Sequence, residues 1–170
     1  MNFIVNNLFS NINSERILRG EDSLLAQQGI GAFNSAVKIL DLFTDKGELL
    51  VWTEGKTGKS DRKYFSKQDP MVPKDINITV LVNQGSASAS EIIAGTLQDL
   101  DRGVVIGRPT FGKGLVQRQL PLDNGAALRV TIARYYTPSG RLIQRPYEDG
   151  NDLAYYRELY AEDRESKIDS

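Results

Sequence analysis

The sequence predicts an α/β domain with a parallel-leaning sheet, packed helices and a β-hairpin. A β-branched apolar run over residues 76–82 is typical of a buried strand, and a helical pattern follows it from about residue 88. Another apolar run at residues 104–106 comes directly after that helix. This order predicts a right-handed crossover between parallel strands. Two further strand patterns, over residues 115–122 and 127–136, are joined by Asp-Asn-Gly, which predicts the hairpin.

Three elements are predicted before the crossover. Residues 31–43 form an amphipathic helix pattern that ends at the sequence Asp-Lys-Gly, and one face of it is apolar. The residues on that face are Phe33, Ala36, Val37, Leu40 and Phe43. A strand over residues 48–54, a turn at 55–58 and a return strand over 62–65 predict a second antiparallel pair. Residues 1–31 show no long period, so no element is predicted there.

Length and composition favour one soluble globular domain. The chain has 170 residues, of which 40% are apolar and 25% charged. We expect a core over residues 1–145, with residues 1–31 atypical, and a charged tail over residues 146–170. The net charge of −1 gives no electrostatic footprint for nucleic acid or an anionic membrane. No apolar run approaches the ~18 residues of a spanning helix, and the first residues do not resemble a signal peptide.

Two missing residue types restrict the chemistry. The sequence contains no histidine and no cysteine. It therefore cannot form a Ser-His-Asp triad, a thiol nucleophile, or a metal site built from imidazole or thiolate ligands. A serine nucleophile in this chain would need lysine, aspartate or glutamate as its base, and Ser-Lys versions of the triad exist.

The junction between the central strand and its helix is the first candidate site. Residues 83–91 read Asn-Gln-Gly-Ser-Ala-Ser-Ala-Ser-Glu, and such small residues let a substrate approach the backbone. The helix start adds N–H donors and a positive dipole end, so a serine here is a candidate nucleophile. The simpler interpretation of this stretch alone is that Ser88 and Glu91 form a capping box.

A second stretch changes that balance. Residues 110–117 read Thr-Phe-Gly-Lys-Gly-Leu-Val-Gln. Together with residues 83–91, Leu-Gln-Asp at 97–99 and Tyr-Thr-Pro-Ser-Gly-Arg at 136–141, they resemble the C-terminal processing peptidases, or tail-specific proteases. The resemblance runs from about residue 36 to residue 144.

This resemblance implies a crotonase/ClpP-like spiral fold and a serine-type endopeptidase that cleaves proteins near their C-termini. It implies a protein or peptide substrate and no metal or organic cofactor, and it leaves homo-oligomerisation open. Members of the family usually act in the bacterial envelope or the plastid lumen. The family's PDZ domain has no counterpart among these residues.

The resemblance also assigns roles to individual residues. Ser88 matches the nucleophile and Lys113 the general base, which requires burial to lower its pKa. Gln117 matches a residue that orients the lysine, and residues 113 and 117 of one extended strand would point the same way. Gly112 and Gly114 would leave room for the lysine to approach the serine.

The oxyanion site follows the family only in part. One donor should be the N–H of Ala89, beside the nucleophile. In the family the other comes from the glycine pair of Asp-Leu-Arg-Asn-Asn-Pro-Gly-Gly. Residues 24–31 here read Leu-Leu-Ala-Gln-Gln-Gly-Ile-Gly, so Ile30 replaces one glycine and Gly31 remains as the candidate donor.

The sequence leaves two alternative functions open and predicts one ion pair. The altered loop leaves open a catalytically inactive domain that only binds peptides. Fold analogy alone leaves open an acyl-CoA binder. Asp99 lies about three helical turns after Ser88, too far for direct contact, and is expected to pair with Arg102 at i+3.

Overall fold

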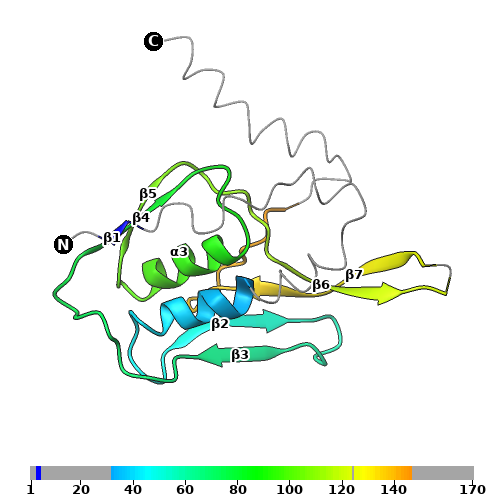
Figure 1. Ribbon diagram of the computed structural model, residues 1–170, viewed down its shortest axis with the longest axis horizontal. Helices are drawn as coiled ribbons and strands as arrows, with labels where there is room; N and C mark the ends of the chain where they lie inside the picture. The colour runs from blue at the N-terminus through cyan, green and yellow to red at the C-terminus, as the bar shows by residue number, and fades with distance from the viewer. Residues whose placement is uncertain (1–2, 5–31, 124, 147–170) are drawn as a thin grey trace, which may run out of the picture.

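The computed structural model describes residues 3–4, 32–123 and 125–146 of the chain. In this part, two sheets lie on either side of two helices (Figure 1). The helix α3 (Ala89–Asp99) contacts one sheet through β5 (Val104–Gly107) and the other through β2 (Leu49–Glu54). The predicted mixed α/β class is confirmed. The predicted C-terminal tail lies outside the described residues apart from Pro146.

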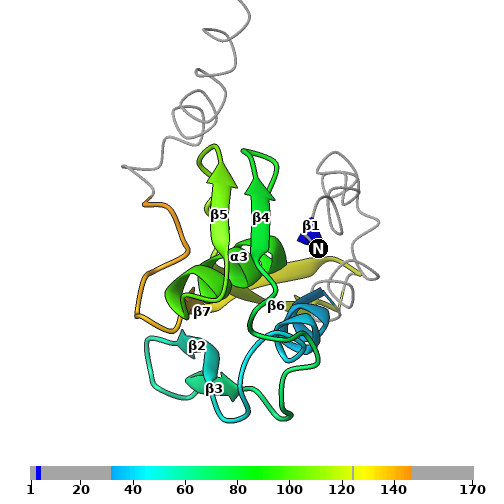
Figure 2. The same cartoon turned by 90° about the vertical axis from the view of Figure 1, so that its left-hand side faces the viewer.

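The smaller sheet contains the predicted crossover. β4 (Ile78–Val82) and β5 pair in parallel, with Val80 opposite Val105, and α3 connects them (Figure 2). β1 (Phe3–Ile4) pairs in parallel with the other edge of β4. Ile78 and Val80 are buried in the same core as the apolar face of α3. This β-α-β unit therefore carries the first candidate motif where the sequence predicted it.

The larger sheet makes the fold less parallel than predicted. Its order is β3 (Arg62–Phe65), β2, β7 (Ala127–Tyr136) and β6 (Leu115–Pro121), and all neighbours are antiparallel. Both predicted hairpins are present, but β7 also pairs with β2 and joins them into one sheet. The ring of Trp52 stacks on that of Tyr136, with centroids 4.3 Å apart, across this contact.

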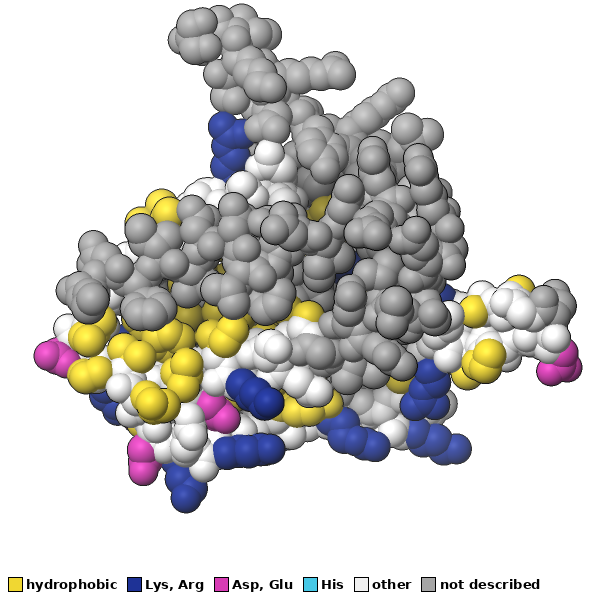
Figure 3. Space-filling model, viewed as in Figure 1, with side chains coloured by type: hydrophobic (Ala, Val, Ile, Leu, Met, Phe, Trp, Pro, Cys, Tyr) yellow, Lys and Arg dark blue, Asp and Glu magenta, His cyan; other side chains and the backbone are white. Residues whose placement is uncertain are grey.

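The β6–β7 hairpin extends away from the body of the protein (Figures 1 and 3). Leu120 and Leu128 face each other across its two strands, and both are exposed, as is Leu122 near the turn. The stem of this hairpin, near residue 115, lies beside the second candidate motif. Within the described ranges, no helix has both the length and the apolar character to cross a bilayer.

A helix over residues 32–40 fills the space beside α3. It is shorter than the predicted 31–43, because residues 41–43 form a turn after it, and residue 31 lies outside the described range. Its predicted apolar face is buried except for Val37, which is partly buried. The ring of Phe33 lies 4.8 Å from that of Tyr64 and 5.3 Å from that of Tyr135, so this helix packs on the antiparallel sheet.

The predicted pairing of Asp99 with Arg102 is wrong. The helix ends at Asp99, so the i+3 spacing of a helix does not apply to Arg102. Arg102 instead donates to the backbone carbonyls of Phe43 at 3.0 Å, Ile76 at 3.0 Å and Pro73 at 2.9 Å. Asp99 accepts hydrogen bonds from the turn at Ser139 and from Arg141. Asp99 thus connects the end of α3 to a distant segment, and Arg102 does the same for the turn that follows the helix.

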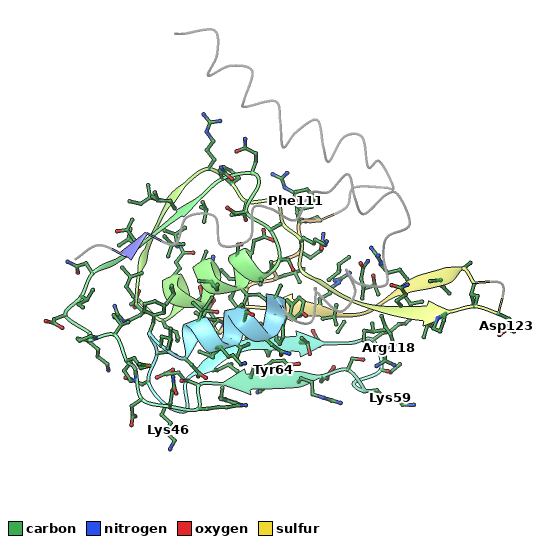
Figure 4. The ribbon with its side chains drawn as sticks, viewed as in Figure 1. Lys46, Lys59, Tyr64, Phe111, Arg118 and Asp123 are labelled. Atoms are coloured by element: carbon green, nitrogen blue, oxygen red, sulfur yellow. The ribbon has the colours of Figure 1, made fainter. Side chains whose placement is uncertain are left out.

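Replacing Arg102 with lysine is expected to lower the free energy of unfolding by about 1–3 kcal/mol. A lysine ammonium lacks the planar fork that reaches three carbonyls on two segments. Urea unfolding of both proteins measures the difference. Arg118→Lys is the matched control, because Arg118 is exposed on β6 (Figure 4), and it should change stability by less than about 0.5 kcal/mol. Equal losses in the two variants would contradict this role of Arg102.

Candidate active site

The two candidate motifs lie against each other. β4 ends at Val82, residues 83–88 turn the chain, and α3 follows. The loop after β5, residues 108–114, includes Phe111 (Figure 4) and returns to this turn. The N–H of Phe111 donates to the carbonyl of Ser86 at 3.0 Å. The parallel arrangement of β4 and β5 explains this, because their carboxyl ends lie at the same edge of the sheet.

Ser88 has an unusual backbone conformation. Its φ of 56° and ψ of −110° lie in a region that favours glycine, and among the described non-glycine residues only Asp101 also has a positive φ. Such conformations cost on the order of 1–3 kcal/mol and concentrate at functional sites. A sharp strand-to-helix turn of this kind exposes the side chain of a nucleophile at the helix start.

The predicted capping box is present at the start of α3. The N–H of Ser88 donates to Glu91 Oε2 at 2.7 Å. On the other side of the box, the Ser88 side chain faces the backbone N–H of Glu91, which also donates to the Ser88 carbonyl at 3.0 Å. The carboxylate half of the box stabilises the helix start without the Ser88 hydroxyl.

Glu91 is the residue that joins the two motifs. Only 6% of it is exposed, and its carboxylate accepts four hydrogen bonds. Oε2 accepts from the N–H groups of Ser88 and of Lys113, the latter at 2.8 Å. Oε1 accepts from the Thr110 hydroxyl at 2.7 Å and from the Gly112 N–H at 2.5 Å. The sequence predicts Glu91 only as part of the cap, because local spacing cannot show a partner some twenty residues away.

The glycines around Lys113 also permit a close contact that the sequence did not predict. A Cβ on Gly112 would lie 2.6 Å from the Cβ of Arg145, and a Cβ on Gly114 would lie 2.4 Å from the backbone nitrogen of Gln144. Gln144 Oε1 accepts from the Gly114 N–H at 3.0 Å. The glycines thus allow residues 143–145 to pack closely on this loop, opposite Glu91.

The pKa of the Lys113 ammonium is lowered from its ordinary value. Burial is the largest cause, because it disfavours the charged form, and the positive charge of Arg129 acts in the same direction. The carboxylate of Glu91 opposes both by stabilising the ammonium. Lys113 as a whole residue is exposed, so solvent moderates the shift, but its direction is that required of a general base.

The other predicted site residues are Gln117, Ala89 and Gly31. Gln117 lies on β6 opposite Thr131 and is exposed. Lys113 precedes that strand, and a register shift between Val116 and Gln117 interrupts the alternation, so strand alternation does not place the two side chains on the same side. Within the described part of the chain, no hydrogen bond joins Gln117 to Lys113. Ala89 is the first residue of α3, where N–H groups have no intrahelical acceptor. Gly31 lies outside the described residues.

Comparisons with known proteins place this arrangement in a family. The chain matches Peptidase family S41 over residues 29–149, which include both motifs. It is 46% identical over 114 residues to a "Carboxy-terminal-processing protease" of Bartonella bacilliformis, covering 67% of this chain and 26% of that protein. It is 37% identical over 116 residues to a "C-terminal processing peptidase, chloroplastic" of Tetradesmus obliquus, covering 68% and 24%.

A solved structure agrees with the sequence relatives. The photosystem II D1 C-terminal processing protease matches with a TM-score of 0.59 and 39% identity, covering 66% of this chain and 28% of that one. The chain spans about a quarter of the length of these relatives. The family match covers well over half of the 170 residues. The chain therefore belongs to peptidase family S41.

Proposed function

We propose that this chain carries the catalytic core of a serine-type endopeptidase that cleaves protein or peptide substrates near their C-termini. Ser88 is the nucleophile and Lys113 the general base. The observation that carries the proposal is that the N–H groups of both residues bind the same oxygen of Glu91, which holds the two backbones close together. The names of the relatives, which describe carboxy-terminal processing, support the substrate class.

The chemistry requires neutral Lys113. Its amine takes the proton of the Ser88 hydroxyl as the serine oxygen attacks the substrate carbonyl. The tetrahedral intermediate collapses, the C–N bond breaks, and the lysine returns the proton to the leaving amine. Water, deprotonated by the same lysine, then attacks the ester carbonyl, the bond from the carbonyl carbon to the Ser88 oxygen breaks, and the lysine returns the proton to that oxygen. In this scheme Gln117 orients the lysine when substrate is bound.

The negative oxygen of the intermediate needs preorganised donors. The N–H of Ala89 is one, because it is at the start of α3 and adjacent to the nucleophile. Gly31 is the proposed second donor, although the loop that contains it departs from the family sequence. We also propose that the chain has the crotonase/ClpP-like spiral fold, in which the two sheets lie around the site.

A fluorophosphonate probe tests the proposal directly, since it labels only an activated serine. We expect labelling at Ser88, located by mass spectrometry of tryptic peptides, together with cleavage of unstructured peptides near their C-termini. Ser90→Ala should leave the labelling unchanged. Peptide binding without labelling at Ser88 would instead identify an inactive peptide-binding domain.

A further inference from the structure

The buried carboxylate of Glu91 contacts both halves of the candidate site. We propose that Glu91 is a positioning residue, which sets the geometry of the Ser88–Lys113 pair by holding both backbones through one carboxylate. This inference rests on the proposed function of those two residues. It goes beyond helix capping, because three of the four hydrogen-bond donors belong to the loop after β5.

The number of donors matches a carboxylate and no neutral side chain. An ionised carboxylate has about four acceptor positions and no proton to place. The side chain of Glu91 fills them with donors at 2.5–2.8 Å, the range of charge-assisted hydrogen bonds. A glutamine would present an NH2 group to two of these donors, and the site is too buried for water to replace the lost acceptor.

The position of Ser88 makes this support important for the reaction. A strained backbone persists only where its surroundings enforce it, and Glu91 bonds the N–H of the strained residue itself. The bond to the Lys113 N–H fixes the start of the lysine side chain in the same way. Relaxation of either segment would move the amine relative to the hydroxyl, and a displacement of about 1 Å can cost about a hundredfold in rate.

The charge of Glu91 gives the inference a signature that a purely structural residue would lack. Its carboxylate stabilises the ammonium form of Lys113 and so raises the pKa of that amine. Removing the charge of Glu91 should therefore lower the pKa of Lys113. Because the neutral amine is the active form, the rise of activity with pH should move to lower pH.

Glu91→Gln in the full chain tests the positioning role. We expect kcat to fall about a hundredfold with a much smaller change in KM, and the pH at which kcat/KM rises to move downward. Amide hydrogen exchange should accelerate at Ser88, Gly112 and Lys113, whose N–H groups lose their acceptor. Glu48→Gln is the matched control, because it removes the same charge from an exposed site and should change none of these quantities.

The results distinguish failure of the positioning role of Glu91 from failure of the proposed function. Wild-type kcat, pH profile and exchange rates in a folded Glu91→Gln variant would overturn the positioning role. If the wild-type chain neither cleaves nor is labelled, the proposed function fails, and the exchange rates alone still decide whether Glu91 holds both segments. If Glu91→Gln does not fold, the positioning role is tested with Thr110→Val, which removes one of the four donors to Glu91. A reduced kcat with an unshifted pH profile supports the proposal, and unchanged kcat and exchange refute it.

Discussion

Replacing Ser88 with alanine is expected to abolish peptide cleavage and to leave the thermal midpoint nearly unchanged. The hydroxyl is the proposed nucleophile, and loss of a serine nucleophile can cost on the order of a millionfold in kcat. Stability should hold because Glu91 still accepts the N–H of residue 88 and so keeps the carboxylate half of the capping box. Peptide cleavage and a thermal melt of the same preparation measure the two effects.

The backbone of Ser88 supplies a second, independent check. Ser88→Gly should be equally inactive yet more stable than Ser88→Ala by about 1 kcal/mol, because glycine adopts a φ of 56° without a Cβ clash. Ser90→Ala, two residues along, should retain activity. If Ser88 were only a helix cap, Ser88→Ala would keep its activity and lose about 0.5–2 kcal/mol of stability. That pattern would reject Ser88 as the nucleophile.

Local sequence signals predicted the elements around the site but not how the sheets assemble. β4, α3 and β5 each show their own period, and short turns mark both hairpins. The pairing of β2 with β7 joins residues more than eighty positions apart, such as Trp52 and Tyr136. The residues of β2 and β7 do not indicate that these two strands pair. The indole N–H of Trp52 also donates to the carbonyl of Thr137 at 3.1 Å, a contact that depends on that pairing.

The candidate site could also be predicted only in part. Its two motifs could be recognised from the residues, and they lie together. The partners of three charged side chains could not be predicted, since Glu91, Asp99 and Arg102 all bind groups far away in the sequence. The strain at Ser88 was also hidden, because no sequence rule places a non-glycine residue at positive φ there. The role of the glycines beside Lys113 needed residues 143–145 to be in position.

Lys113→Arg is expected to be nearly as inactive as Lys113→Ala. The proposed reaction needs a neutral amine, and an arginine guanidinium stays protonated at any pH that the fold survives. In the wild-type chain, burial and the charge of Arg129 lower the lysine pKa, so the neutral fraction appears at lower pH than for an ordinary lysine. Activity should therefore rise with pH through that lowered pKa, as a kcat/KM profile with a peptide substrate would show.

Arg129 allows the direction of this effect to be tested without touching the proposed base. Arg129→Gln removes a positive charge that disfavours the ammonium, so the pKa of Lys113 should increase and the rise of activity should move to higher pH. Arg62→Gln, which removes an exposed arginine from β3, should leave the profile in place. Cleavage by Lys113→Arg at near wild-type rates would remove Lys113 from the mechanism. An unmoved profile in Arg129→Gln would show that the amine of Lys113 does not set the pH dependence.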